Sequence, residues 1–338
     1  MAKNSNLHSA KVVKNDEFYT RLQDIEDELY HYWYGRPETF KNKVVFCNCD
    51  NPNQSNFWVY FHKRYKELGL AGLVATHYSV SEQVYVKTYT GGDDNNVEAG
   101  VVAYLQGDGD FRSDECIEIL KMADIVVTNP PFSLFREYIS QLMKYNKKFI
   151  ILGNINAVTY KEVFSYIKEN DLWLGARPLN KDMYFDVPEE YRNYLVENKK
   201  EGSAYKIVNG VVMGRLANAC WFTNIDIPRR HECLITGSFY NGNEEKYTKY
   251  DNYDAINVDK VMDIPEDYDG VMGVPITFLG KYNPEQFEIL GVTAAHWDES
   301  DIMKEIKISD TLCHGPFING KELYKRILIK ALPHIEEE

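Results

Sequence analysis

Short apolar runs alternate with helical stretches between residues 43 and 170. Five runs have the near-continuous hydrophobicity of strands covered on both faces, as parallel strands are; they span residues 43–48, 71–78, 101–105, 123–129 and 147–154. Residues 55–70, 113–122, 133–146 and 159–170 space their apolar positions as helices do, with Ser113 and Ser133 as expected N-caps. This alternation predicts an α/β protein with a doubly wound, Rossmann-like sheet.

The pattern changes after Asp171. Residues 172–188 and 210–228 resemble longer strands joined by a charged hairpin or insertion. Beyond Arg230 the chain is rich in Tyr, Asn, Asp and Gly, and its helical periodicity is weak. We therefore expect two domains, a larger one over residues 1–228 and a smaller, loop-rich one over residues 229–338.

Composition places the chain among soluble globular proteins, with 44% hydrophobic and 26% charged residues. It contains no apolar run of membrane-spanning length and no signal peptide, so we expect a cytoplasmic protein without membrane contact. The six cysteines form no CxxC pair, and the spacing of Cys47 and Cys49 does not suit zinc, so no metal site is expected. A net charge of −13 makes a nucleic-acid partner less expected, although one face can still be basic.

Polar residues follow the predicted strands. Ligands of doubly wound sheets bind beyond the carboxyl ends of the strands, so the segments to examine are residues 49–52, 77–79, 107–111, 129–132 and 154–156.

The segment after the fourth strand, Asn129-Pro130-Pro131-Phe132, suits activation of an aromatic amine. The lone pair of such an amine is delocalised into the ring, and two acceptors that bind its hydrogens free that lone pair for attack. The Asn129 side-chain oxygen and the Pro130 carbonyl are the expected acceptors, and Pro131 restricts Pro130 to an extended conformation. Phe132 offers a face on which an extruded base can stack. The alternative is a strand that ends in a proline-stiffened turn.

These residues carry a family resemblance. "TNPPF" resembles motif IV of S-adenosylmethionine-dependent amino-methyltransferases, and "NDEFYT" resembles the segment that closes over their cofactor. Longer blocks resemble the EcoRI-type adenine-specific DNA methyltransferases from about Lys14 to about Gly291; they include "CDNPNQSNFWVYF", "GDGDFRSDECIEILKMADIVVTNPPFSLFREYI", "RPLNKDMYF" and "VPITFLGKYNPEQFEILG". The resemblance implies a class I methyltransferase fold, with residues 1–228 binding the cofactor and residues 229–338 forming a target-recognition region.

By resemblance, Phe18, Tyr19 and Thr20 contact the methionine end of S-adenosyl-L-methionine, or else simply begin an amphipathic helix. The loop after the first strand lacks the glycines usual in these enzymes. Its Asp50 carboxylate can bind the amino group of the methionine moiety, and Ser55 or Asn56 can bind the ligand or cap the following helix.

The remaining cofactor residues follow the second and third predicted strands. The second strand ends without the usual acidic residue, so His77 or Ser79 takes its place in holding the ribose, or His77 is structural. Asp108 or Asp110 can accept a hydrogen bond from the cofactor's adenine amine, with Phe111 lining the pocket. Gly-Asp-Gly-Asp is also turn-prone, so an Asx turn is the alternative.

The implied reaction is transfer of a methyl group to the N6 amine of a flipped adenine in double-stranded DNA, by the modification half of a restriction–modification system or by a solitary relative. A cognate restriction endonuclease acting on the same site is then an expected partner. Base-reading candidates include Arg229, Arg230, Asn241, Asn243, Lys246 and Lys249, none of which the sequence singles out. Three other functions fit the motif less well: a protein glutamine N5-methyltransferase, an RNA adenine methyltransferase, and a non-catalytic binding module.

Overall fold

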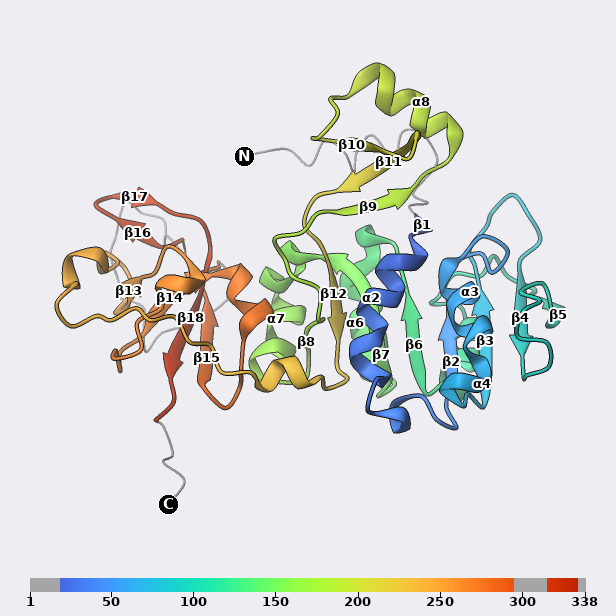
Figure 1. Ribbon diagram of the computed structural model, residues 1–338, viewed down its shortest axis with the longest axis horizontal. Helices are drawn as coiled ribbons and strands as arrows, with labels where there is room; N and C mark the ends of the chain where they lie inside the picture. Colours follow the sequence, from blue (N-terminus) through green and yellow to red (C-terminus); the bar gives the residue numbers. More distant parts are fainter. Residues whose placement is uncertain (1–18, 295–314, 334–338) are drawn as a thin grey trace. The chain divides into compact units, whose positions relative to one another are not determined.

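The computed structural model describes residues 19–294 and 315–333. The described chain divides into two compact units, one of residues 19–154 and 175–225, the other of residues 155–174, 226–294 and 315–333. Figure 1 shows the elements of both units. The assignment of catalysis to residues 1–228 and target recognition to residues 229–338 stays a prediction.

The first unit contains a mixed sheet, which confirms the predicted α/β class. Its strands run in the order β5-β4-β3-β2-β6-β7-β12, and β3, β2, β6 and β7 are parallel. β12 pairs antiparallel with β7. In chain order the strands are β2 (Val44–Cys47), β3 (Gly72–Thr76), β4 (Tyr85–Tyr89), β5 (Val101–Tyr104), β6 (Ile125–Thr128), β7 (Lys148–Asn154) and β12 (Ala219–Thr223).

Helices cover both faces of this sheet, as expected for a doubly wound fold. Phe57 of α3 (Asn56–Lys63) lies edge-on to Trp221, while Phe135 of α6 (Phe135–Lys144) packs on Phe222. Because neighbouring residues of a strand point to opposite faces, α3 and α6 lie on opposite sides of β12. Helix α2 (Leu22–Trp33) packs beside α3 in front of the sheet in Figure 1.

One predicted strand was misplaced. Residues 101–105 were expected to form a buried parallel strand, but β5 lies at the sheet edge, pairs antiparallel with β4, and exposes all four of its residues. Strand β4, which reaches the parallel strands through an antiparallel pairing with β3, was not predicted. The error arose because an apolar run of five residues does not distinguish a buried strand from an exposed edge strand.

The predicted helices formed, with changes at their ends. Residues 55–70 form α3 and the short α4 (Tyr65–Leu68), and residues 159–170 contain α7 (Lys161–Lys168). Ser113 caps α5 (Asp114–Met122) as predicted, by accepting from the Cys116 N–H at 3.3 Å. Ser133 is not a cap: it lies inside the 3₁₀ turn η2 (Phe132–Leu134), and α6 begins after Leu134 without a side-chain cap.

Residues 175–218 add a second, antiparallel sheet to the first unit. Its order is β1-β9-β11-β10, with β1 (Tyr19–Thr20), β9 (Met183–Asp186), β10 (Tyr205–Val208) and β11 (Val211–Leu216), and helix α8 (Glu189–Asn198) lies between β9 and β10. Strand β1 comes from the start of the described chain and pairs with β9, Thr20 opposite Phe185. The insertion therefore fixes the segment on which the predicted cofactor contacts of Tyr19 and Thr20 lie.

The second unit combines α7 with a four-stranded sheet and many short turns. The sheet order is β13-β14-β18-β15, with β13 (Ile256–Asn257), β14 (Met272–Pro275), β15 (Phe287–Val292) and β18 (Arg326–Ala331). The unit also contains a hairpin of β16 (Phe317–Ile318) and β17 (Lys321–Glu322), the short strand β8 (Trp173–Leu174) and several 3₁₀ turns. These turns are η3 (Ile155–Thr159), η4 (Pro228–His231), η5 (Glu244–Lys246), η6 (Val261–Asp263) and η7 (Ile276–Lys281). Within residues 19–294 and 315–333, no helix is long and apolar enough to cross a bilayer.

Candidate active site

The Asn-Pro-Pro-Phe segment leaves the carboxyl end of β6, a strand buried along its whole length. Pro130 is buried, whereas Asn129 and Phe132 are half-buried. The Leu134 N–H donates to the Pro131 carbonyl at 3.0 Å and closes the turn into α6. The acceptor of the turn's hydrogen bond is therefore the Pro131 carbonyl and not the Pro130 carbonyl.

The loop after β2 reaches this segment directly, because β2 and β6 are neighbouring parallel strands. The Asp50 carboxylate is 92% buried and accepts from the Asn129 backbone N–H at 3.3 Å and from the Thr128 hydroxyl at 3.3 Å. Asp50, predicted only as a cofactor ligand, therefore also holds the backbone of the predicted catalytic asparagine.

The N-terminal segment meets the first turn of α3. The Tyr19 hydroxyl donates to Gln54 Oε1 at 2.6 Å, and Asn56 Nδ2 donates to the Thr20 carbonyl at 2.8 Å. Thr20 is buried, and its Oγ1 has no hydrogen-bond partner among the described residues. Phe18, the third residue predicted here, lies outside the described residues.

Ser55 caps α3. Its Oγ accepts from the N–H groups of Phe57 and Trp58, at 3.2 and 3.5 Å. The sequence left both helix capping and ligand binding open for Ser55, and in the structure Ser55 caps the helix.

The loop after β3 contains His77 and Ser79. His77 is buried, and its ring lies edge-on to Tyr85 with the centroids 5.0 Å apart. Ser79 Oγ accepts from the N–H groups of Ser81 and Glu82, so it stabilises its own turn. Ser79 also lines a surface hollow with Asp108 and with residues of the segments 80–84 and 105–107.

The Gly-Asp-Gly-Asp loop lies against the loop after β3, through the hydrogen bond from Ser79 N–H to the Asp108 carbonyl at 2.9 Å. Asp108 Oδ1 accepts from the Asp110 N–H, the Asx geometry that the sequence left open. Both oxygens of Asp110 bind the Arg112 guanidinium, which lowers the pKa of the Asp110 carboxyl. Asp108 is exposed, and Arg112 does not bind its carboxylate as it binds that of Asp110.

Phe111 packs towards α6. It is buried, meets the Tyr138 ring edge-on at 5.0 Å, and its carbonyl accepts from Gln141 Nε2 at 2.9 Å. Arg112 also reaches α6 through Glu137, at 2.9 Å. The loop after β5 is therefore attached to the helix that follows Asn-Pro-Pro-Phe, although β5 itself is at the far edge of the sheet.

Gly109 is the point where these two loops touch most closely. Its φ is +78°, and a Cβ there would lie 2.0 Å from the His77 carbonyl oxygen. We expect Gly109→Ala to lower the free energy of unfolding by about 2–3 kcal/mol and to weaken cofactor binding. Urea denaturation and equilibrium dialysis measure the two effects.

Gly202→Ala is the matched control for Gly109→Ala. Gly202 has nearly the same φ, +79°, but no atom within 4 Å of its added Cβ. It therefore reports the cost of backbone strain without a steric clash. Equal effects of the two substitutions would show that the contact with His77 is unimportant.

Sequence reasoning missed three buried residues that hold the site together. Asn48 directly follows β2, Thr128 precedes Asn129, and Tyr138 lies one turn into α6; these residues are at most 4% exposed. The Thr128 hydroxyl donates to the Asn48 carbonyl, and the Tyr138 hydroxyl donates to Asn48 Oδ1. Nothing in the sequence distinguishes Tyr138 from the other 24 tyrosines.

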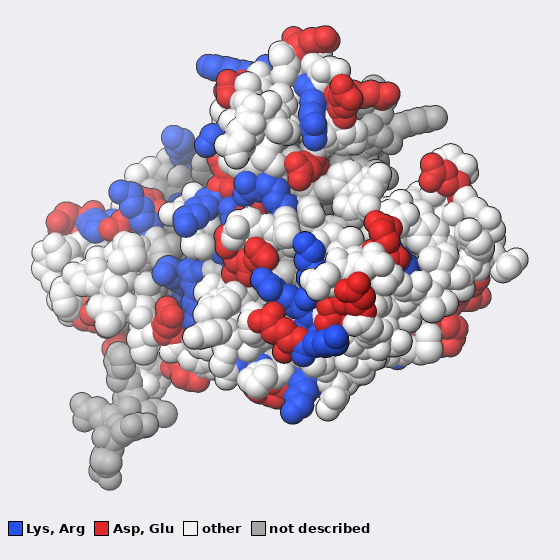
Figure 2. Space-filling model, turned by 45° about the vertical axis from the view of Figure 1, so that its right-hand side comes forward, with Lys and Arg blue, Asp and Glu red and all other residues white. Residues whose placement is uncertain are grey.

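Charged side chains of both signs mix on the surface. Figure 2 shows Lys and Arg interspersed with Asp and Glu on the face that it draws, so the net charge of −13 does not make that face uniformly acidic. A contact with phosphate groups is compatible with this distribution.

Arg230, one of the base-reading candidates in the second unit, is buried. Arg230 is 92% buried, lies 3.8 Å above the Trp173 ring, and donates to Asn170 Oδ1 and Asp226. Arg230 is therefore not expected to reach a base edge.

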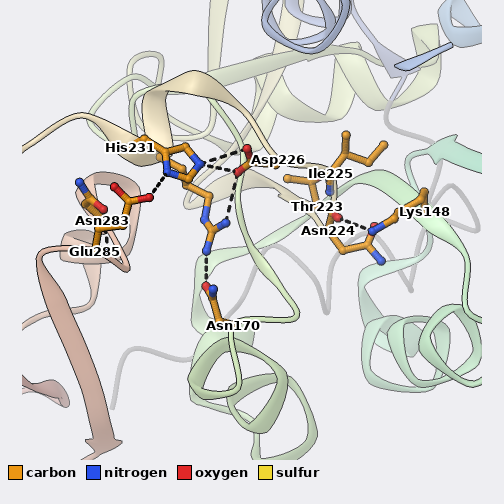
Figure 3. A network of polar contacts seen from close by, with 10 residues as sticks. Lys148, Asn170, Thr223, Asn224, Ile225, Asp226, His231, Asn283 and Glu285 are labelled. Carbon is orange, nitrogen blue, oxygen red and sulfur yellow. Dashed lines mark hydrogen bonds and ion pairs between the residues drawn. The ribbon is translucent and has the colours of Figure 1, made fainter. Parts of the chain in front are cut away.

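His231 bridges the carboxylates of Asp226 and Glu285 (Figure 3). Its Nδ1 lies 2.9 Å from Glu285 Oε1 and its Nε2 lies 3.0 Å from both oxygens of Asp226. Hydrogen bonds to Glu285 and then to Asp226 raise the pKa of His231. The two ion pairs of protonated His231 therefore stabilise the folded protein fully at pH values below the unfolded-state pKa of about 6.5. This stabilisation disappears as the pH rises through the folded-state pKa.

We expect His231→Gln to lower the melting temperature more at pH 5.5 than at pH 9. The histidine is 39% exposed, so the effect stays within about 1 kcal/mol. Differential scanning calorimetry at both pH values measures it, and a loss independent of pH would contradict the charged bridge.

Known proteins resemble this chain over nearly its full length. The model of the family described as "Adenine-specific methyltransferase EcoRI" matches residues 6–332. Type II methyltransferase M.EcoRI of Escherichia coli is 48% identical, over 97% of each chain. Type II methyltransferase M.MpnI of Mycoplasma pneumoniae is 40% identical, over 97% of this chain and 99% of its own. No solved structure matches the chain.

Proposed function

The chain belongs to the EcoRI family of adenine-specific methyltransferases, and from this we propose that it is a site-specific DNA adenine N6-methyltransferase of a restriction–modification system. The observation that carries the proposal is Asn129-Pro130-Pro131-Phe132 at the end of β6, joined to the loop of β2 by the hydrogen bond from Asn129 N–H to Asp50. Amine-activating residues and a carboxylate able to bind a cationic cofactor therefore lie side by side.

The N-terminal segment at the start of α3 and the loop after β2 fit S-adenosyl-L-methionine, which would supply a methyl group on a cationic sulfur. Thr20 Oγ1 is a buried polar atom without a partner among the described residues, of the kind that a bound polar ligand satisfies. We assign Tyr19, Thr20 and Asp50 to the methionine end. The Asp50 carboxylate provides the negative charge that a cationic amino group requires.

The adenosine end is assigned to the two loops beyond β3 and β5. Asp108 is exposed on the loop that contacts Ser79 and is the preferred acceptor for an adenine amine. Asp110 serves instead through its ion pair with Arg112, which orders the loop. Phe111 and His77 are the buried rings of this region. Ser55 and Asn56 act by fixing α3 and Thr20.

Asn129 Oδ1 and the Pro130 carbonyl accept the two hydrogens of the target amine. This draws the nitrogen towards tetrahedral geometry and localises its lone pair for attack on the methyl carbon. When bound, S-adenosylmethionine would supply the methyl group without its bonding electrons, which its sulfur would retain, and the amine would release one proton to solvent. The methylated amine is acidic, so no strong base is required. Phe132 stacks on the flipped adenine.

The partners follow from the same proposal. Double-stranded DNA is the substrate, with residues 229–338 as the target-recognition region. A cognate restriction endonuclease acting on the same sequence is the expected counterpart, and the cytoplasm the expected location.

The test is methyl transfer from radiolabelled S-adenosylmethionine to unmethylated double-stranded DNA, with total RNA and a protein extract as parallel acceptors. We expect label in DNA, recovered as N6-methyladenine after nucleoside analysis. Label only in RNA or only in protein would replace the proposed substrate by the corresponding alternative. Absence of label from all three acceptors would reject methyl transfer.

A further inference from the structure

Asn48 is held on two sides by residues that flank Asn-Pro-Pro-Phe. Tyr138, in the helix that follows the segment, donates its hydroxyl to Asn48 Oδ1. Thr128, in the strand that precedes it, donates its hydroxyl to the Asn48 carbonyl. Tyr138 and Thr128 are fully buried and Asn48 is 4% exposed, so water does not compete for these bonds.

The next residue, Cys49, has a left-handed backbone with φ of +70°. Side chains other than glycine disfavour this conformation by roughly 1–2 kcal/mol, so the surrounding structure must impose it. This is the turn in which the sequence lacks the glycines usual in related enzymes. Asn48, anchored by two hydroxyls, is the neighbour through which the turn is held.

Asp50 follows directly, and its carboxylate binds Thr128 and the Asn129 N–H. A continuous set of contacts therefore runs from Tyr138 through Asn48 and the Cys49 turn to Asp50 and Asn129. Displacement of Asn48 would be transmitted to Asp50 because only one strained residue separates them.

We propose that Tyr138 is a positioning residue: its hydroxyl holds Asn48, and thereby keeps the strained turn and the Asp50 carboxylate in the geometry that binds the cofactor. The inference rests on the proposed function, since it assumes that Asp50 contacts S-adenosylmethionine. The tyrosine–asparagine pair thus stabilises at Cys49 a positive φ that a glycine would adopt without strain. Burial raises the pKa of Tyr138 well above its ordinary value, so the hydroxyl stays a donor at neutral pH.

The test compares Tyr138→Phe with wild type in binding and turnover. We expect the KM and the Kd for S-adenosylmethionine to rise roughly tenfold, the equivalent of one lost hydrogen bond, while kcat at saturating cofactor falls less. Isothermal titration calorimetry and methyl transfer to DNA measure these quantities. An unchanged KM and Kd would overturn the inference.

A second substitution tests the mechanism. Cys49→Gly removes the backbone strain, so adding it to Tyr138→Phe should recover most of the lost affinity. A purely structural loss would not be rescued in this way. If Tyr138→Phe does not fold, Asn48→Ala removes the Oδ1 acceptor of the same hydrogen bond and should raise the same Kd.

Tyr89→Phe is the matched control. Tyr89 is also buried in the first unit, and its hydroxyl donates to Asp94 Oδ1 at 2.7 Å; it pairs with Leu73 near the start of β3, away from the carboxyl ends of the parallel strands. This variant should keep the wild-type Kd for the cofactor, and an equal loss in both variants would overturn the inference. If wild type binds S-adenosylmethionine but transfers no methyl group to any acceptor, the proposed function fails instead.

Discussion

Replacing Asn129 with alanine is expected to lower kcat for methyl transfer about 10²–10³-fold, the range found when one preorganised hydrogen-bonding group is removed from an active site. The substitution deletes the acceptor Oδ1 and leaves the Pro130 carbonyl as the only remaining member of the proposed pair. Cofactor affinity should stay close to wild type, because Asp50 binds the backbone N–H of residue 129 and not its side chain. Single-turnover transfer and equilibrium dialysis measure the two quantities separately.

Asn146→Gly serves as the control for Asn129→Ala. Asn146 is exposed in the turn between α6 and β7, at the amino ends of the parallel strands and so away from Asn129, and its φ of +50° suits glycine. This variant should turn over at the wild-type rate. Undiminished turnover of Asn129→Ala would show that the amine is activated by other groups.

The position of the Asn-Pro-Pro-Phe segment was predictable because the strands around it are buried on both faces. β2, β6 and β7 are continuous apolar runs, and parallel strands covered by helices have this composition. Once β6 is identified, its carboxyl end is the place where ligands bind. The proximity of Asp50 to Asn129 follows from the pairing of β2 with β6.

The edge of the sheet was not predictable in the same way. Val101, Val102 and Tyr104 are as apolar as the residues of a central strand, yet they are 46–74% exposed. Which strand lies at an edge depends on pairings made by the whole chain. The hydrogen bond from Tyr138 to Asn48 joins residues 90 positions apart, and only the packing of α6 against the sheet brings them together.

Likewise, several predicted ligands have structural partners that composition does not reveal. Asp110 is bound by Arg112, two residues away, and Ser55 by the N–H groups of its own helix. Both are common local arrangements of these residue types. A residue type suited to binding a cofactor is thus equally suited to stabilising the loop beside it.

Glu28→Ala is expected to have the largest effect on stability. Glu28 is 99% buried, and its carboxyl accepts from the Tyr32 hydroxyl and from the N–H groups of Ala176 and Arg177, at 2.7–2.9 Å. Alanine leaves three buried donors without this acceptor, each costing about 1–3 kcal/mol. Since water can enter the space that is left, we expect the free energy of unfolding to fall by about 3–5 kcal/mol. Urea denaturation followed by circular dichroism measures it.

The same contact explains why this loss should also reach the site. Glu28 lies on the helix that follows Thr20, and Ala176 begins the segment that leads into β9, the partner of β1. Releasing residues 175–177 therefore loosens the sheet that fixes Tyr19 and Thr20, so the Kd for S-adenosylmethionine should rise as well. Asp27→Ala is the control: Asp27 is exposed on the same helix and binds only Gln23 among the described residues, so its loss should change the free energy of unfolding by less than about 0.5 kcal/mol. Similar destabilisation by both substitutions would show that the acceptor role of Glu28 is not what stabilises the unit.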